Sequence, residues 1–203
     1  MKILFITKKE NRVYELKEIL EKFLDVANVD SLFDLDFEYD LSLCERDLTK
    51  RALEKVEKIW NDKKDEYDYI MCEEFGLYTE YAPNILGVDH KRWWPGTDRD
   101  RNEALIKLFE GIKDRKIYYK SSFIAKSSDG FIFTSTGFTR GFLGRKVKEK
   151  NGIGYDSVFA IEGKKHLSQY SQDEIKEFYA SNKSLEELAK KISHHKIDMK
   201  KEG

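Results

Sequence analysis

The chain has 203 residues, which is enough for one substantial hydrophobic core and short for two. Lys and Arg number 37 against 38 Asp and Glu, so the near-neutral charge favours neither nucleic acid nor an anionic membrane as a partner. No apolar run reaches the length of a membrane span, and residues 2–7 resemble a strand and not a signal peptide. Cys44 and Cys72 form neither a disulfide framework nor a metal-binding spacing, so we expect reduced thiols in the cytoplasm.

The beginning of the chain predicts a strand that turns into a helix. Residues 2–7 read as a buried strand, and apolar residues at helical spacing predict a helix over residues 11–23. Residues 7–12 between them carry a Thr hydroxyl, two Lys and an Arg, and cations beside a helix N-terminus suit a polyphosphate. The glycines of a P-loop are missing, so a solvated charged turn is an equal alternative.

Three further elements lead to the middle of the chain. Residues 28–40 alternate loosely, which predicts a second strand with an acidic edge. Either Asp47 or Thr49 is expected to cap a helix that runs to about Trp60. The next buried strand is expected over residues 67–72.

Two adjacent carboxylates, Glu73 and Glu74, follow this central strand and precede Gly76. Carboxylates at the end of a buried strand, where an open α/β sheet usually places its ligand, indicate a site. Side chains alternate along a strand, so the two would point in different directions unless the strand ends there. Their oxygens suit Mg²⁺, which leaves its other positions to water and substrate phosphate. The alternative is a solvated strand end that happens to be acidic.

Residues 78–96 have few regular signals and contain both prolines and the basic and aromatic residues 90–94. Loops of this kind often carry function, and the alternative is aromatic packing with Lys and Arg reaching to solvent. Thr97 is expected to cap a helix over residues 98–109, which has acidic residues in its first turn and Gly111 beyond its end.

The second half of the chain predicts a β-hairpin and then two helices. Residues 116–126 and 130–138 alternate in polarity about an Asp-Gly turn, which is a strong hairpin signal. Helical spacing covers about residues 171–179 and 184–192, and residues 196–203 are expected to fray. No repeat, low-complexity segment or linker divides the chain, so we expect a single domain.

Four short motifs along most of the chain carry a family resemblance. Residues 7–15 read TKKENRVYE, Glu38 follows Phe37 late in the second predicted strand, residues 73–77 read EEFGL, and residues 153–159 read IGYDSVF after Gly152. In this order they resemble the motifs T-G/S-N-x-x-K-x-x-E, P-E-x-Q, E/D-D-S-G-L and F-G-Y/W-D-P-I-F of the inosine triphosphate pyrophosphatase family. Residues 87–93, GVDHKRW, are similar to the family's G-x-Y-S-A-R-Y loop.

The resemblance implies an enzyme that hydrolyses non-standard purine nucleoside triphosphates. In the family, Mg²⁺ bridges the triphosphate, and an acidic residue activates a water that attacks the α-phosphorus, giving nucleoside monophosphate and pyrophosphate. By position, Glu74 is implied to be the base, with Glu73 beside it in the catalytic pair. Glu38, Glu73 and Glu74 are implied to hold Mg²⁺, or Mn²⁺ in its place.

The residues implied to bind substrate form two sets. Those facing the phosphates are Thr7, Lys9, Arg12 and Lys55. Those facing the base and its surroundings are Arg92, Ile153, Gly154, Tyr155 and Asp156, with Asp156 hydrogen-bonding the base edge. The expected fold is α/β, one domain over residues 1–203 with a long twisted mixed β-sheet flanked by helices and two lobes around a central cleft. A homodimer is implied by the resemblance alone.

Several positions depart from the family pattern. Lys9 stands where the family has Asn, and Arg12 where it has Lys, so positive charge is kept or added. Glu at positions 73 and 74 is one methylene longer than Asp, and misplacing a catalytic group by about 1 Å can cost a hundredfold in rate. Ile153 replaces the Phe that stacks on the purine.

The S-H-R triplet, which in the family helps to read the purine, has two candidate positions. One alignment puts residues 179–181 (YAS) there, so that the triplet is absent and base preference is altered. The other uses residues 193–195 (SHH) and requires an insertion of about a dozen residues after Phe159. The first fits the spacing better. A catalytically weakened nucleotide-binding relative is the alternative function, and a purely structural dimer subunit is a third.

Overall fold

The computed structural model describes residues 1–35, 38–42, 45–148, 153–161 and 164–202. The chain divides into two compact units. Unit 1 contains Met1–Glu74, Ser121–Gly137 and Ser181–Gly203, and unit 2 contains Phe75–Lys120 and Phe138–Ala180. Phe37, Cys44 and Gly152, named above for their motifs or chemistry, lie outside the described residues.

Six strands form one mixed sheet in the order β2-β1-β3-β4-β5-β6. The strands are β1 (Lys2–Phe5), β2 (Asn28–Ser31), β3 (Tyr69–Tyr78), β4 (Lys116–Ser127), β5 (Ile132–Leu143) and β6 (Phe159–Ala160). β1 pairs in parallel with both β2 and β3, whereas β5 pairs antiparallel with β6. The helices are α1 (Glu10–Leu20), α2 (Leu48–Lys63), α3 (Asp98–Leu108), α4 (Gln172–Lys176) and α5 (Ala180–Glu202). The predicted α/β class is confirmed.

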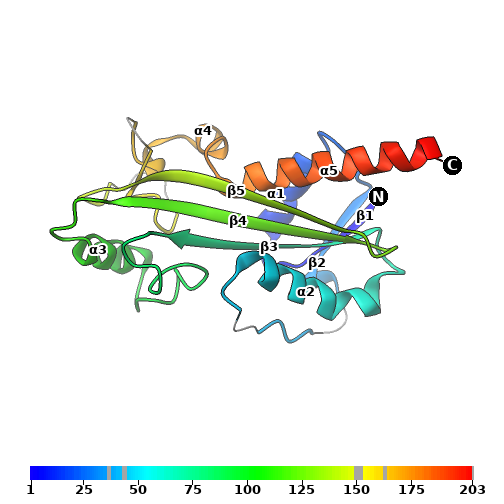
Figure 1. Cartoon of the computed structure of the whole chain (residues 1–203), viewed down its shortest axis with the longest axis horizontal. Helices are drawn as coiled ribbons and strands as arrows, with labels where there is room; N and C mark the ends of the chain where they lie inside the picture. Colours follow the sequence, from blue (N-terminus) through cyan, green and yellow to red (C-terminus); the bar gives the residue numbers. More distant parts are fainter. Residues whose placement is uncertain (36–37, 43–44, 149–152, 162–163, 203) are drawn as a thin grey trace. The chain divides into compact units, whose positions relative to one another are not determined.

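Alternation along the strands gives unit 1 two apolar layers. Ile3 and Phe5 of β1 and Met71 of β3 pack in one layer with α1 and α5. Leu4 of β1 and Ile70 of β3 point the other way and pack with α2. Figure 1 shows α1 and α5 on one side of these strands and α2 on the other. Each fully buried side chain of this size stabilises the fold by roughly 1.5–3 kcal/mol.

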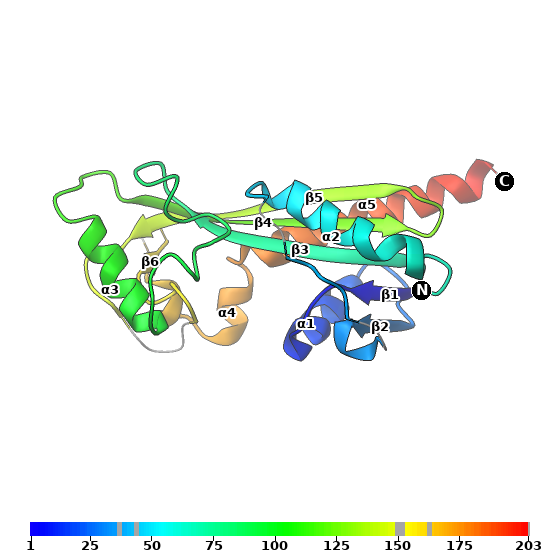
Figure 2. The same cartoon turned by 90° about the horizontal axis from the view of Figure 1, so that it is seen from below.

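Unit 2 has an apolar core of its own. Leu105 of α3, Ile117 and Tyr119 of β4, Leu143 of β5 and Phe159 of β6 are all buried in it. The rings of Tyr119 and Phe159 stack with centroids 4.7 Å apart. Figure 2 shows α3, β6 and α4 in this part of the chain.

The second strand is shorter than predicted. β2 ends at Ser31 and is followed by a 3₁₀ turn, η1 (Leu32–Asp34), and the described residues 35 and 38–40 are not part of a strand. The Ser31 hydroxyl accepts a hydrogen bond from the Phe33 amide at 3.3 Å, and the Asp34 carboxylate accepts one from the Ser31 amide at 2.6 Å. These local side-chain bonds compete with a strand ladder, which explains the early end.

Two other elements are longer than predicted. β3 continues to Tyr78, well past Cys72, so Glu73 and Glu74 lie inside the strand and not at its end. α5 continues to Glu202 instead of ending at Ile192. Among the described helices, none is long and apolar enough to cross a membrane.

The predicted caps and the hairpin turn are confirmed. Asp47, and not Thr49, caps α2 by accepting a hydrogen bond from the Lys50 amide at 3.0 Å. Thr97 and Asp100 form a capping box at the start of α3. Gly130 has a φ of +93°, which is the left-handed conformation that the turn between β4 and β5 requires.

Candidate active site

The carboxyl end of β1 lies beside the first half of β3 in unit 1, because Phe5 pairs with Met71. β1 leads through α1 to β2, and β2 leads through α2 to β3, with these two helices on opposite faces of the strands. An open α/β sheet binds its ligand where the chain changes faces in this way. Thr7 and the two glutamates of β3 follow these strand positions directly.

Glu74 points to the α2 side of the sheet, as Ile70 and Cys72 do. Its Oε2 accepts a hydrogen bond from Nε of Arg51 at 3.2 Å, and its Oε1 accepts one from Nζ of Lys55. Both cations come from α2, one helical turn apart. Arg51 and Glu74 are each 8% exposed. One carboxylate therefore pairs with two cations, of which Arg51 is buried and Lys55 is partly exposed.

Glu73 points to the opposite side of the sheet, toward α1 and α5. Its Oε2 accepts a hydrogen bond from Arg12, and its Oε1 accepts one from the Ser121 hydroxyl at 2.8 Å. The Arg12 guanidinium also donates to Glu15 and to the Ser181 hydroxyl. Burial alone would lower the pKa of Arg12, but the charges of Glu73 and Glu15 outweigh it and raise that pKa.

The three predicted metal ligands are not gathered by the structure. Glu73 and Glu74 lie on opposite faces of β3, and each already accepts hydrogen bonds from cations. Glu38 is exposed and lies beyond η1, not at the end of a strand. Among the described residues, no group of three His, Cys, Asp or Glu side chains could hold a metal ion. Glu74 and the segment of Glu38 share the α2 side, since Leu35 and Tyr39 pack in that layer.

The turn between β1 and α1 is exposed to solvent where α1 begins. Lys9 is the N-cap residue of α1 and is exposed, and its side chain makes no capping hydrogen bond. Thr7 is half-buried, and its hydroxyl accepts a hydrogen bond from the Lys9 amide at 3.3 Å. Amides at the start of a helix, flanked by a cation, suit an anionic ligand.

Asp156, like Glu74, is a buried carboxylate, and it lies in unit 2. Its Oδ2 accepts a hydrogen bond from the Tyr179 hydroxyl at 2.8 Å and one from the Ile153 amide at 3.3 Å, and its Oδ1 accepts one from the Tyr119 hydroxyl at 3.3 Å. Burial raises the pKa of Asp156, and these hydrogen bonds offset only part of the effect. Both carboxyl oxygens are thus held by phenols.

The residues before Asp156 are tied to the loop that precedes α3. The Gly154 amide donates to Asp98 at 2.9 Å, and the Gly154 φ of +62° explains the glycine. The Trp93 indole donates to the Tyr155 hydroxyl, which donates to the His90 carbonyl. The side chain of Ile153 lies outside this hydrogen-bonded network and is 72% exposed.

Arg92 is separate from these contacts. Its side chain is exposed and forms an ion pair with Asp89 at 3.4 Å. Trp93, the next residue, packs against the core of unit 2. The structure therefore places aromatic packing at Trp93 and a solvated cation at Arg92.

The two candidate positions for the missing triplet have different surroundings. Tyr179 lies at Asp156, the residue implied to read the base. His195 packs against Phe131 and Phe133 of the hairpin, with ring centroids 4.8 and 5.3 Å apart. Only the first position contacts a predicted base-binding residue among those described.

The sequence reasoning missed Arg51, Ser121 and Tyr119. Arg51 could have been found from the sequence. Its helical spacing from the buried apolar residues of α2 places it on the side of the helix that faces the sheet, and it lies four residues before Lys55. Tyr119 and Ser121 lie at every second position of β4 together with Ile117 and Phe123. The four side chains therefore share one face of the strand, which the apolar members predict to point inward. Their partners lie far away in the sequence and are visible only in the fold.

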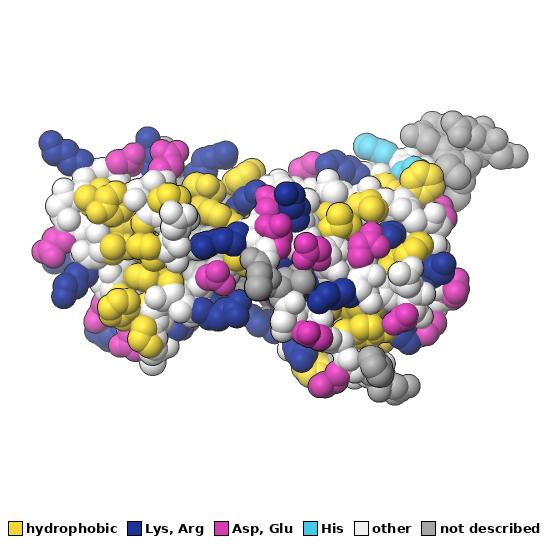
Figure 3. Space-filling model, turned by 60° about the horizontal axis from the view of Figure 1, so that its bottom comes forward, with side chains coloured by type: hydrophobic (Ala, Val, Ile, Leu, Met, Phe, Trp, Pro, Cys, Tyr) yellow, Lys and Arg dark blue, Asp and Glu magenta, His cyan; other side chains and the backbone are white. Residues whose placement is uncertain are grey.

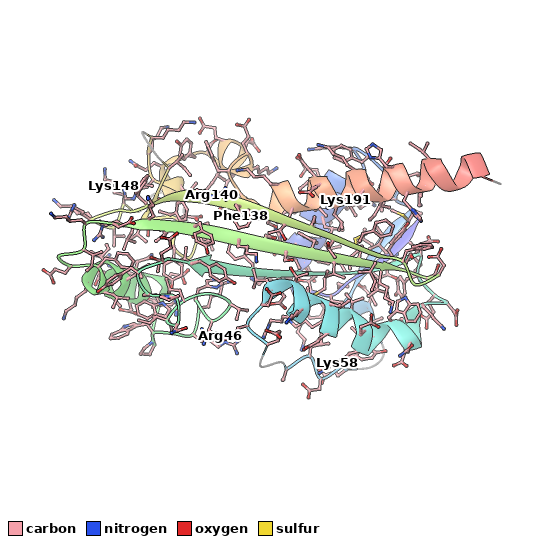
Figure 4. The ribbon with its side chains drawn as sticks, in the orientation of Figure 1. Arg46, Lys58, Phe138, Arg140, Lys148 and Lys191 are labelled. Atoms are coloured by element: carbon pink, nitrogen blue, oxygen red, sulfur yellow. The ribbon has the colours of Figure 1, made fainter. Side chains whose placement is uncertain are left out.

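A cavity of about 450 Å³ lies elsewhere in unit 2, along the outer side of β4 and β5. Tyr118, Phe138 and Arg140 line it, and the last two are marked on β5 in Figure 4. The Arg140 guanidinium lies 4.9 Å from the centre of the Phe138 ring. No predicted site residue belongs to its described lining, so size alone does not identify the active site.

A family model described as the Ham1 family matches residues 3–191. A dITP/XTP pyrophosphatase of Campylobacter jejuni is 30% identical over 199 residues, covering 95% of this chain and 96% of that protein. One from Caldanaerobacter subterraneus is 26% identical over 197 residues, with 95% and 96% covered.

The fold has solved counterparts. The Ham1 protein of Staphylococcus aureus aligns with a TM-score of 0.84 at 16% identity, covering 96% of this chain and all of that one (100%). A nucleoside-triphosphatase of Mycobacterium abscessus, also titled dITP/XTP pyrophosphatase, aligns with a TM-score of 0.71 at 23% identity, with 86% and 91% covered. The resemblance deduced from the motifs is confirmed, and the chain belongs to the Ham1 family.

Proposed function

We propose that the chain hydrolyses non-standard purine nucleoside triphosphates to nucleoside monophosphate and pyrophosphate. The observation that carries the proposal is the buried Glu74 between Arg51 and Lys55 at the switch point of the sheet. Two cations that converge on one carboxylate at this position suit an anionic ligand. A triphosphate supplies that anion, and the relatives named dITP/XTP pyrophosphatase support the substrate class.

In the proposed reaction, Glu74 accepts a proton from a water molecule whose oxygen attacks the α-phosphorus. The bond from that phosphorus to the bridging oxygen breaks, and pyrophosphate leaves with the bonding electron pair. Lys55 and Arg51 stabilise the negative charge on the phosphate oxygens, and the turn of Thr7 and Lys9 binds phosphate through its amides and its cation. Catalysis of this kind is mostly positioning and charge neutralisation.

The proposal includes a divalent cation, Mg²⁺ or alternatively Mn²⁺. Glu74 offers the hard carboxylate oxygens that such ions prefer, and Glu38 belongs to a segment on the same side of the sheet. Glu73 does not fit that set, because it faces the other side. When bound with the substrate, the cation would neutralise charge on the phosphate oxygens.

Base recognition is proposed for the Asp156 region, together with Ile153, Gly154, Tyr155 and Arg92. Tyr179 already occupies one oxygen of Asp156, and Ile153 offers an aliphatic surface in place of an aromatic ring. Both features support a base preference that differs from that of the named relatives. Tests on one base alone would therefore be insufficient.

The proposed location, oligomeric state and form of the substrate rest on the family resemblance and on the near-neutral charge of the chain. Figure 3 shows acidic and basic side chains interspersed over the face that it displays. We include in the proposal a cytoplasmic homodimer that acts on free nucleotides and not on nucleic acid or membranes. Light scattering at several protein concentrations measures the oligomeric state.

The test is pyrophosphate release from a panel of standard, deaminated and otherwise modified NTPs and dNTPs with Mg²⁺ or Mn²⁺. Native chain is compared with Glu74→Gln and with Glu54→Gln, an exposed glutamate of the same helix as Lys55. We expect turnover on a subset of bases, lost in Glu74→Gln and kept in Glu54→Gln. Silence of the native chain across the panel would contradict the proposal.

One observation favours a second candidate, a nucleotide-binding relative without turnover. Both oxygens of Glu74 are engaged by cations, so a base that cannot release them would not accept a proton from water. This candidate predicts that nucleoside triphosphates raise the melting temperature while no pyrophosphate appears.

A further inference from the structure

A polar cluster on the far side of β3 is distinct from the Glu74 site. The Arg12 cluster consists of Arg12, Glu15, Glu73, Ser121, Ser181 and Ser184. Beyond the bonds of Arg12 and Glu73 already given, the Ser121 and Ser184 hydroxyls lie 2.9 Å apart, and Ser184 donates to the Ser181 carbonyl at 3.0 Å. The six residues all belong to unit 1, and they come from α1, β3, β4 and the start of α5.

The hydrogen bonds of the Arg12 guanidinium indicate its role. Its guanidinium donates to two carboxylates and one hydroxyl, all from the protein itself. Arg12 thus links α1 to β3 and to the start of α5, whereas Lys55 and Arg51 both donate to Glu74.

The position of Arg12 gives the cluster a role in the site. Arg12 is in the first turn of α1, three residues after Lys9, and its amide donates to the Lys9 carbonyl at 3.1 Å. Glu73 holds this first turn against the middle of β3, where the side chains of both are mostly buried. Fixing the first turn also fixes the direction of its backbone amides.

We infer that Glu73 and Arg12 are positioning residues, which set the Thr7–Lys9 turn for phosphate, and that Glu73 neither takes the proton nor binds the metal. The inference rests on the proposed function and divides the acid pair between two tasks. Glu74 acts on the reacting atoms from one face of β3. Glu73 acts through Arg12 from the other.

The experiment compares Glu73→Gln, Arg12→Met, the double variant and Glu74→Gln, with Glu21→Gln as the matched control. Glu21 is the C-cap residue of the helix that contains Arg12, and its side chain forms an exposed ion pair with Lys17 at 3.7 Å. Three quantities are measured: kcat and KM for the best substrate of the panel, the affinity for inorganic pyrophosphate by calorimetry, and Tm.

For Glu73→Gln we expect KM and the pyrophosphate dissociation constant to rise at least about tenfold, because the turn is misplaced, while kcat stays within about threefold. Tm falls by several degrees in each single variant and by less than the sum in the double variant. Glu74→Gln shows the opposite split, with kcat lost. Glu21→Gln changes none of the three.

Two results would overturn the inference. One is a loss of kcat in Glu73→Gln as large as in Glu74→Gln, which would make Glu73 a catalytic or metal-binding group. The other is additive Tm shifts with unchanged pyrophosphate affinity in Glu73→Gln. If the native chain hydrolyses no nucleotide, the proposed function is wrong. The inference is then tested by the Tm values of the single and double variants and by their affinity for pyrophosphate.

Discussion

Glu74 in unit 1 and Asp156 in unit 2 are both buried carboxylates, 8% and 3% exposed, yet their surroundings differ in kind. Glu74 forms ion pairs with Arg51 and Lys55. Asp156 accepts hydrogen bonds from the hydroxyls of Tyr119 and Tyr179. The partners of Glu74 are therefore basic groups, whereas those of Asp156 are phenols, and burial dominates at Asp156 and raises its pKa.

The difference separates two kinds of chemistry along one chain. A carboxylate among cations suits phosphate, metal and proton transfer, because charge can be exchanged between its partners and the substrate. A carboxyl group among phenols suits recognition of neutral hydrogen-bonding groups such as a base edge. The predictions below test this separation from both sides.

The largest effect is expected at the cations of Glu74. Arg51→Met and Lys55→Met each keep much of the side-chain length and remove the charge, so kcat/KM should fall by roughly 100- to 1,000-fold. Lys58→Met is the matched control, because Lys58 is exposed on the same helix and donates to the Asp40 carbonyl at 2.8 Å (Figure 4). Losses no larger than that of Lys58→Met would contradict a phosphate-binding role.

The next largest effect is expected at His90, which is buried in unit 2. Burial lowers the pKa of His90 to about 4, below its ordinary value near 6.5. The unfolded chain then binds the proton first, so the stability due to His90 is present above about pH 6.5 and is lost as pH falls toward 4, by up to about 3 kcal/mol. Urea unfolding from pH 7 to pH 4 measures this loss.

His90→Gln should remove that pH-dependent part, whereas His194→Gln, at an exposed position of α5, should keep it. An identical pH dependence in His90→Gln and the native chain would show that His90 is not held neutral.

A smaller and opposite pH dependence is expected at Asp156. Its raised pKa means that the folded chain keeps the proton longer, so its contribution to stability is present below about pH 4 and declines as pH rises through the folded-state pKa. A tenfold difference in proton affinity between the folded and unfolded chains corresponds to about 1.4 kcal/mol of stability. Asp156→Asn cannot titrate, so the stability of the native chain relative to this variant should fall as pH rises. A constant difference would refute the raised pKa.

The smallest effect is expected at Tyr179. Its hydroxyl lowers the pKa of Asp156, so Tyr179→Phe should raise that pKa further and cost about 1 kcal/mol of stability. Carbon-detected NMR of the Asp156 carboxyl measures the pKa directly. A lowered pKa in Tyr179→Phe would mean that Tyr179 does not stabilise the charged form.

The sequence predicted β1, β4, β5 and the first parts of β2 and β3, because periodicity and turn signals are local, but it did not predict the two-residue strand β6. It did not predict that β3 continues through Glu73 and Glu74, since their acidity looks like a strand end although Arg12, Arg51 and Lys55 neutralise them in the fold. The early end of β2 was hidden for a related reason. The Ser31–Asp34 hydrogen bonds compete with a strand in a stretch whose alternation is weak.

The partners of Asp156 show a further limit. Tyr119 and Tyr179 are 37 and 23 residues away from it, and no spacing rule joins them. Family motifs suggested that Asp156 reads a base, but only the fold shows that two phenols already hold its oxygens.

The most direct test of the account compares Glu74→Gln with Asp156→Asn on one panel of nucleoside triphosphates that differ only in the base. The account predicts that Glu74→Gln loses kcat by at least about 100-fold on every base that the native chain accepts. Asp156→Asn should instead keep much of kcat and change the order of kcat/KM among the bases. Equal loss on all bases in Asp156→Asn, or retained kcat in Glu74→Gln, would contradict the division between the two carboxylates.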